Sequence, residues 1–148
     1  MESRKKIIFL GDSITDAGHD LQMAPEGQSR LGDGYVSRIA AMLGVDEVDT
    51  ADREGTRARI VCMGPFIFPW PLEYRNWIPR IREIDEVERA AATEAGVLFI
   101  PLHDLLSREA GIAGYDRITV DGVHLTGRGA GLIAREWLRR TEFRKKEQ

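Results

Sequence analysis

Three short apolar segments, each bounded by Gly or Pro, most constrain how this chain can fold. They are residues 6–11 (KIIFLG), 58–64 (ARIVCMG) and 96–102 (GVLFIPL). Each is almost continuously apolar and rich in β-branched or aromatic side chains, which is typical of strands buried on both faces of a parallel sheet. The sequence therefore predicts three parallel strands.

Amphipathic helical patterns lie between and after these segments. They cover residues 33–44, 76–96, 102–111 and 126–143. The second pattern carries Ile81, Ile84, Val87 and Ala91 at helical spacing, with Pro79 in its first turn. Thr126 is a good N-cap for the last pattern. Alternating strands and helices predict an α/β fold, in which reactive groups gather beyond the carboxyl ends of the strands.

One segment, residues 45–58, interrupts this alternation. It is acidic and polar and has no convincing apolar period, although another strand and helix are expected at this point. We expect a short polar loop there, and a sheet that is narrow for 148 residues. A chain of this length suits one domain, here residues 1–148.

Charge and cysteine content limit the class of protein. The net charge of −3 gives no support for a nucleic-acid partner. The lone Cys62 cannot form an internal disulfide, which fits a reducing compartment. The apolar run Ile7–Gly11 is too short for a signal peptide or a membrane span. We expect a cytoplasmic protein with no membrane span.

Ser13 follows the first predicted strand directly, after Gly11 and Asp12. A serine at such a turn is exposed and lies near backbone N–H groups that can bind an oxyanion, but its hydroxyl needs an adjacent base. The same residues also serve as ordinary turn and cap residues. The chain contains neither GxxxxGK[ST] nor GxSxG, so two other strand-to-helix motifs are excluded.

Asp121 and His124 lie three residues apart, just before the last predicted helix. A tight loop can place such a carboxylate on one imidazole nitrogen and leave the other nitrogen for a serine hydroxyl. A plain turn at Asp121 is the alternative. The other histidines, His19 and His103, have no acid so favourably spaced, although His103 could in principle be the base. No metal-ligand spacing occurs, so no metal site is expected.

These residues carry a resemblance to a known family. FLGDSIT near the start, paired with DGVHLTGRGAGLIAREWL near the end, resembles the GDSL family, also called SGNH hydrolases. The similarity runs from residue 6 to about residue 140. It implies a flavodoxin-like three-layer α/β/α sandwich and a cofactor-free esterase or lipase acting on lipid, acyl or acetyl-sugar esters. It further implies Ser13 as nucleophile and backbone oxyanion donor, with Asp12 beside it, His124 as base and Asp121 as its orienting acid.

The chain departs from the family in its middle. The family's other two oxyanion donors, a glycine N–H and an asparagine side chain, belong to motifs that this sequence does not contain. Its one asparagine, Asn76, lacks the family context. Compared with the family pattern, several tens of residues are thus absent at the position of residues 45–58. The sheet could therefore have open strand edges that a second copy of the chain covers.

Three hypotheses follow for the function. The first is a serine esterase whose substrate pocket includes Phe66, Phe68, Trp70 and Trp77, unless these aromatic side chains are core. The second is a catalytically impaired remnant that binds a ligand or partner. The third is a module that binds a nucleotide or phosphate at the GDSIT turn, which no glycine fingerprint supports.

Overall fold

Two of the three predicted strands form a parallel pair in the computed structural model, which describes residues 9, 13–16, 32–43 and 60–141. Strand β1 (Val61–Met63) pairs with β2 (Leu98–Ile100) in the register Val61 to Leu98 through Met63 to Ile100. The Gly64 N–H continues the ladder to the Ile100 carbonyl at 3.0 Å. Apart from Phe9, the third predicted strand lies outside the described residues.

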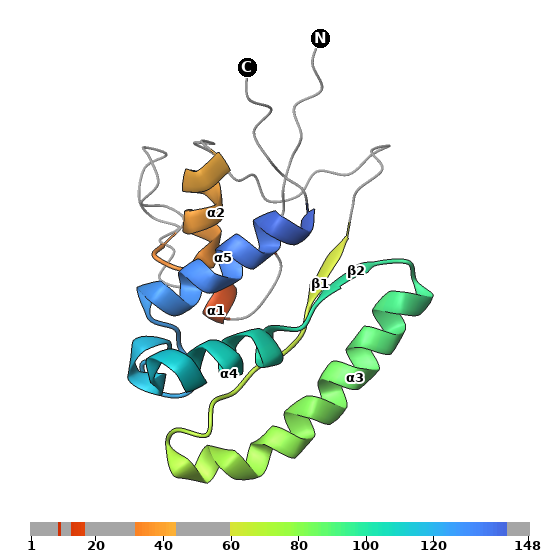
Figure 1. Cartoon of the computed structure of the whole chain (residues 1–148). Helices are drawn as coiled ribbons and strands as arrows, with labels where there is room; N and C mark the ends of the chain where they lie inside the picture. Colours follow the sequence, from red (N-terminus) through yellow and green to blue (C-terminus); the bar gives the residue numbers. More distant parts are fainter. Residues whose placement is uncertain (1–8, 10–12, 17–31, 44–59, 142–148) are drawn as a thin grey trace.

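Helices lie on both sides of these strands (Figure 1). Helix α3 (Ile78–Glu94) contacts β2 on one side, and α5 (Gly127–Thr141) contacts it on the other. Helix α2 (Tyr35–Leu43) packs along α5, and α4 (Leu102–Ala113) follows β2 directly. This layering confirms the predicted α/β fold with a small parallel sheet.

The predicted helices appear close to their expected bounds. Pro79 lies in the first turn of α3. Thr126 caps α5, since its hydroxyl oxygen accepts a hydrogen bond from the Gly129 N–H at 3.2 Å. Three shorter helical segments complete the described chain: α1 (Ser13–Asp16), η2 (Leu72–Trp77) and η3 (Tyr115–Arg117).

The main core lies between α2, α5, α4 and β2. Phe9 joins it at the edge, because its ring packs against Tyr35 and Trp137 with centroids 5.8 and 5.6 Å away. Burying these apolar side chains supplies most of the favourable free energy that holds the layers together. The largest fully buried side chains are Phe68, Ile39, Ile100, Leu106, Ile118, Ile133 and Thr119.

Helix α3 turns a different face to the sheet from the one that its apolar residues predict. Ile84 and Val87 are exposed, whereas Asp85 and Ala92 are buried. Asp85 packs against Gly64, where a Cβ atom would collide with its carboxylate, and it forms an ion pair with Arg89 at 2.7 Å. The expected apolar face of this helix is therefore wrong, because the space above Gly64 and the ion pair favour the face that carries Asp85.

Several other sequence-based expectations concern residues outside the described ranges or stay predictions. The polar segment 45–58, His19 and Asp12 lie outside the described residues, and the single domain of residues 1–148 stays a prediction. No helix within the described part is long and apolar enough to cross a membrane. In that same part, no group of three or more His, Cys, Asp or Glu side chains could hold a metal ion.

Candidate active site

The loop between η3 and α5 holds the predicted acid and base. Thr119 and Leu125 form an antiparallel bridge across it, and the Val120 N–H donates to the His124 carbonyl at 2.9 Å. The buried Thr119 hydroxyl donates to the same carbonyl at 2.7 Å and accepts from the Gly122 N–H at 2.8 Å. This hydrogen-bond network closes residues 119–125 into a tight loop with a defined shape.

Within this loop, Asp121 contacts His124 in two ways. Its Oδ2 lies 2.7 Å from Nδ1 of the imidazole, and its Oδ1 accepts the backbone N–H groups of Val123 and His124 at 2.9 and 2.7 Å. The hydrogen bond from the His124 side chain, followed by these backbone hydrogen bonds, lowers the pKa of Asp121 to about 2. The carboxylate is therefore ionised at neutral pH and orients the imidazole through Nδ1.

Gly122 makes this turn possible. Its φ of +91° favours glycine, and a Cβ atom there would collide with the Trp70 backbone carbonyl. Its own carbonyl accepts the Phe68 N–H at 3.0 Å. The loop that presents His124 is thus fixed against the segment that follows β1.

A cavity of about 170 Å³ opens beside His124. Ile14 of α1 lines it, and Ile14 is the neighbour of Ser13, the first residue of that helix. The Thr15 hydroxyl lies 2.9 Å from the Tyr35 hydroxyl, which ties α1 to α2. The side chain of Ser13 lies outside what the structure describes. The fold nevertheless brings the helix that begins at Ser13 to the cavity that His124 lines.

Arg38 is a residue of this cavity that the sequence analysis did not single out. It lies on α2, one helical turn after Tyr35, and its Nε is buried with no hydrogen-bond partner. The other described lining residues come from the start of α2, the His124 loop and the start of α5: Asp33, Gly34, Tyr35, Leu125, Gly127 and Ala130. The available sequence signal was a single arginine within an otherwise mostly apolar helix.

The four aromatic residues predicted as a substrate pocket lie elsewhere. Phe68 is 1% exposed and belongs to the core, and Phe66 packs against it with ring centroids 5.9 Å apart. Trp70 and Trp77 are largely exposed. None of the four is among the residues that line the cavity beside His124. Asn76 lies in η2 and does not line it either.

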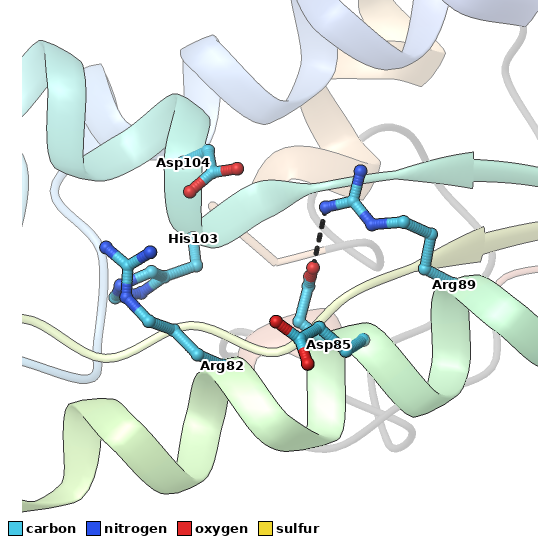
Figure 2. A pocket seen from close by; sticks show the side chains of 6 residues that line it. Arg82, Asp85, Arg89, His103 and Asp104 are labelled. Carbon is cyan, nitrogen blue, oxygen red and sulfur yellow. Dashed lines mark hydrogen bonds and ion pairs between the residues drawn. The ribbon is translucent and has the colours of Figure 1, made fainter.

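His103 lines a different cavity, of about 200 Å³, between α3 and α4. Figure 2 shows the charged side chains of both helices that surround it, including the ion pair between Asp85 and Arg89. His103 is buried, and its Nδ1 has no partner. Burial, followed by the charge of Arg82, lowers its pKa. The two described histidines therefore do not share a cavity, and only His124 lies beside α1.

Comparisons with known proteins find relatives through the fold alone. No family model and no curated protein sequence matches the chain. Solved structures of Axe2, an acetylxylan esterase from Geobacillus stearothermophilus, do match. One variant has 17% sequence identity and a TM-score of 0.74, with 97% of each chain covered. A second has 17% identity and a TM-score of 0.73, with 99% of each chain covered.

Three of the matching Axe2 structures are described as catalytic mutants. In them an aspartate, a histidine three residues further on, and a serine close to the N-terminus are each replaced by alanine. Identities of 17–18% over almost the whole length show a common architecture. The chain therefore has the SGNH-like α/β fold of the acetylxylan esterase Axe2.

Proposed function

We propose that this protein is a serine esterase in which Ser13 is the nucleophile, His124 the general base and Asp121 the acid that orients His124. The single observation that carries the proposal is the Asp121–His124 hydrogen bond beside a cavity that α1 also lines. The three catalytic mutants of Axe2 support it, because they involve the same residue types with the same spacing between acid and base.

The proposed mechanism follows from the state of the imidazole. Because ionised Asp121 accepts a hydrogen bond from Nδ1–H, Nε2 is the nitrogen that can take a proton from the Ser13 hydroxyl. The Ser13 oxygen attacks the ester carbonyl carbon while Nε2 takes its proton. Collapse of the tetrahedral intermediate breaks the ester bond, and Nε2 returns the proton to the departing alcohol. Water then attacks the acyl-serine by the same steps and releases the acid.

Oxyanion stabilisation is the weak part of this proposed site. The backbone N–H of Ser13 is the one donor that the family resemblance assigns, since the motifs of the other two are missing from the sequence. Loss of one such donor lowers turnover by roughly 10²–10³-fold in a protease studied for this effect. We therefore expect slow turnover, and an impaired chain that binds esters without cleaving them is the second candidate function.

Short acyl esters are the first substrates to test. A cavity of about 170 Å³ has room for a small acyl group and part of an alcohol. Axe2 is described as an esterase of acetylated xylan, so acetyl esters of sugars are the natural starting point. We place the cleaved bond between Ser13 and His124, with its carbonyl oxygen directed to the Ser13 N–H.

The test compares hydrolysis of 4-nitrophenyl acetate by wild type, Ser13→Ala and Ser107→Ala. Ser107 lies in α4 and lines neither cavity, so it is the matched control. We expect Ser13→Ala to abolish hydrolysis and labelling by a fluorophosphonate, and Ser107→Ala to retain both. Hydrolysis that survives Ser13→Ala would refute the proposal. Binding of the ester to the wild type without cleavage or labelling would instead favour the impaired chain.

A further inference from the structure

The cavity beside His124 contains a cationic side chain that no residue of the described chain neutralises. Arg38 lines the cavity, and no carboxylate within residues 32–43 or 60–141 forms an ion pair with it. Its Nε is buried and makes no hydrogen bond. A buried donor without a partner is costly, so this position favours a ligand that brings an acceptor.

The surroundings hold the guanidinium against the start of α5. A Cβ atom at Gly127 would lie 2.6 Å from Arg38 Nη2, so the absence of a side chain at Gly127 leaves the room that the guanidinium occupies. Gly127 is the first residue of α5, and the amino end of this long helix adds partial positive charge on the same side. The cation therefore sits where a second positive potential reinforces it.

Among the described residues that line this cavity, Asp33 is the one with an acidic side chain, and it is exposed. It does not come within ion-pair distance of Arg38. Water solvates the exposed carboxylate of Asp33, which weakens its effect on the arginine, whereas the Nε of Arg38 has no hydrogen-bond partner. Among the described lining residues, Arg38 therefore determines the sign of the charge inside the cavity.

We propose that Arg38 makes this site selective for esters that carry a carboxylate close to the ester bond. The guanidinium would bind that carboxylate through two parallel N–H···O hydrogen bonds while the ester lies between Ser13 and His124. The inference rests on the proposed esterase activity for its catalytic consequence. The anion-binding role of Arg38 can be measured without catalysis.

The kinetic test uses two nearly isosteric substrates, mono-4-nitrophenyl succinate and its methyl ester, which lacks the negative charge. We expect Arg38→Gln to lower kcat/KM for the charged ester, relative to the neutral one, by about 10- to 100-fold, the usual effect of losing charge-assisted hydrogen bonds. Arg80→Gln is the matched control, because Arg80 is exposed on α3 and pairs with Glu83 at 2.9 Å. An unchanged ratio in Arg38→Gln would overturn the inference.

The binding test separates this inference from the esterase proposal. The Arg38 Nε–H resonance is identified by its loss in Arg38→Gln, and wild-type protein is titrated with succinate and, separately, with uncharged succinamide. We expect a saturable shift with succinate and none with succinamide. If wild type cleaves neither ester but shows this shift, the esterase proposal fails and the anion site stands. No shift, or equal shifts with both compounds, refutes the anion site whatever the esterase activity.

Discussion

Replacing Gly122 by alanine tests the account of the Asp121–His124 loop most directly. At a φ of +91° an alanine costs about 1–2 kcal/mol in backbone conformation alone. The new Cβ would also collide with the Trp70 carbonyl and lie 2.9 Å from Cδ2 of Tyr74. A backbone carbonyl cannot rotate away as a side chain can, and overpacking of this kind costs about 1–3 kcal/mol more.

Loss of the hydrogen bond from the Phe68 N–H to the Gly122 carbonyl adds about 1 kcal/mol. The expected loss of unfolding free energy in Gly122→Ala is thus about 3–6 kcal/mol. A domain of ordinary stability has about 5–15 kcal/mol in total, so the effect is large but measurable. Because Gly122 lies between Asp121 and His124, the proposed esterase activity should fall together with the stability.

Two further glycines separate the contributions to this loss. Gly96 has a φ of +66° but nothing within 4 Å of a Cβ, so Gly96→Ala should cost only the conformational part, about 1–2 kcal/mol. Gly111 lies in α4 with open space around it and no positive φ. Gly111→Ala should stabilise the protein by about 0.5–1 kcal/mol, because alanine favours the helix.

Urea unfolding of the three variants, followed by circular dichroism, measures these free energies. The unfolding free energy should be highest for Gly111→Ala, followed by wild type and then Gly96→Ala, and it should be lowest for Gly122→Ala. If Gly122→Ala were as stable as Gly96→Ala, the close contact with the Trp70 carbonyl would not exist in solution. A stability within about 0.5 kcal/mol of wild type would refute the loop conformation itself.

Three other predictions concern the same loop. Asp121→Asn should lower kcat/KM by roughly 10³–10⁴-fold with little change in KM, because an amide facing Nδ1 of His124 selects the wrong tautomer; equal activity would refute the role of Asp121. Folding lowers the pKa of Asp121 from 3.8 to about 2, so the ionised carboxylate stabilises the folded state. This stabilisation is fully present above pH 3.8 and is lost as the pH falls through about 2. The difference in unfolding free energy between wild type and Asp121→Asn should therefore shrink over that interval. Thr119→Val should cost about 1–3 kcal/mol by leaving the Gly122 N–H without its acceptor, whereas Thr93→Val, on the exposed face of α3, should cost less than about 0.5 kcal/mol.

Much of this fold was predictable because its signals are local. Residues 61–63 and 98–100 form strands within continuous apolar segments, and α2 and α5 bury the apolar faces that their periodicity predicts. The contact between Asp121 and His124 also spans only three residues, so a short loop suffices to form it. Such short-range patterns depend on backbone geometry and on the partition of side chains between water and core. Residues that are close in the sequence determine both.

The face of α3 and the content of the cavity beside His124 were decided by tertiary structure. Asp85 is buried and Val87 exposed because Gly64, directly after β1, leaves space for a carboxylate, and Arg89 pairs with that carboxylate. Arg38 meets Gly127 only because α2 packs along α5, which begins more than eighty residues later in the chain. The sequence alone determined the two described strands, the four long helices and the contact between Asp121 and His124. Which charged side chains those elements enclose depended on contacts between distant segments, because the environment of a charge is set by whatever surrounds it in space.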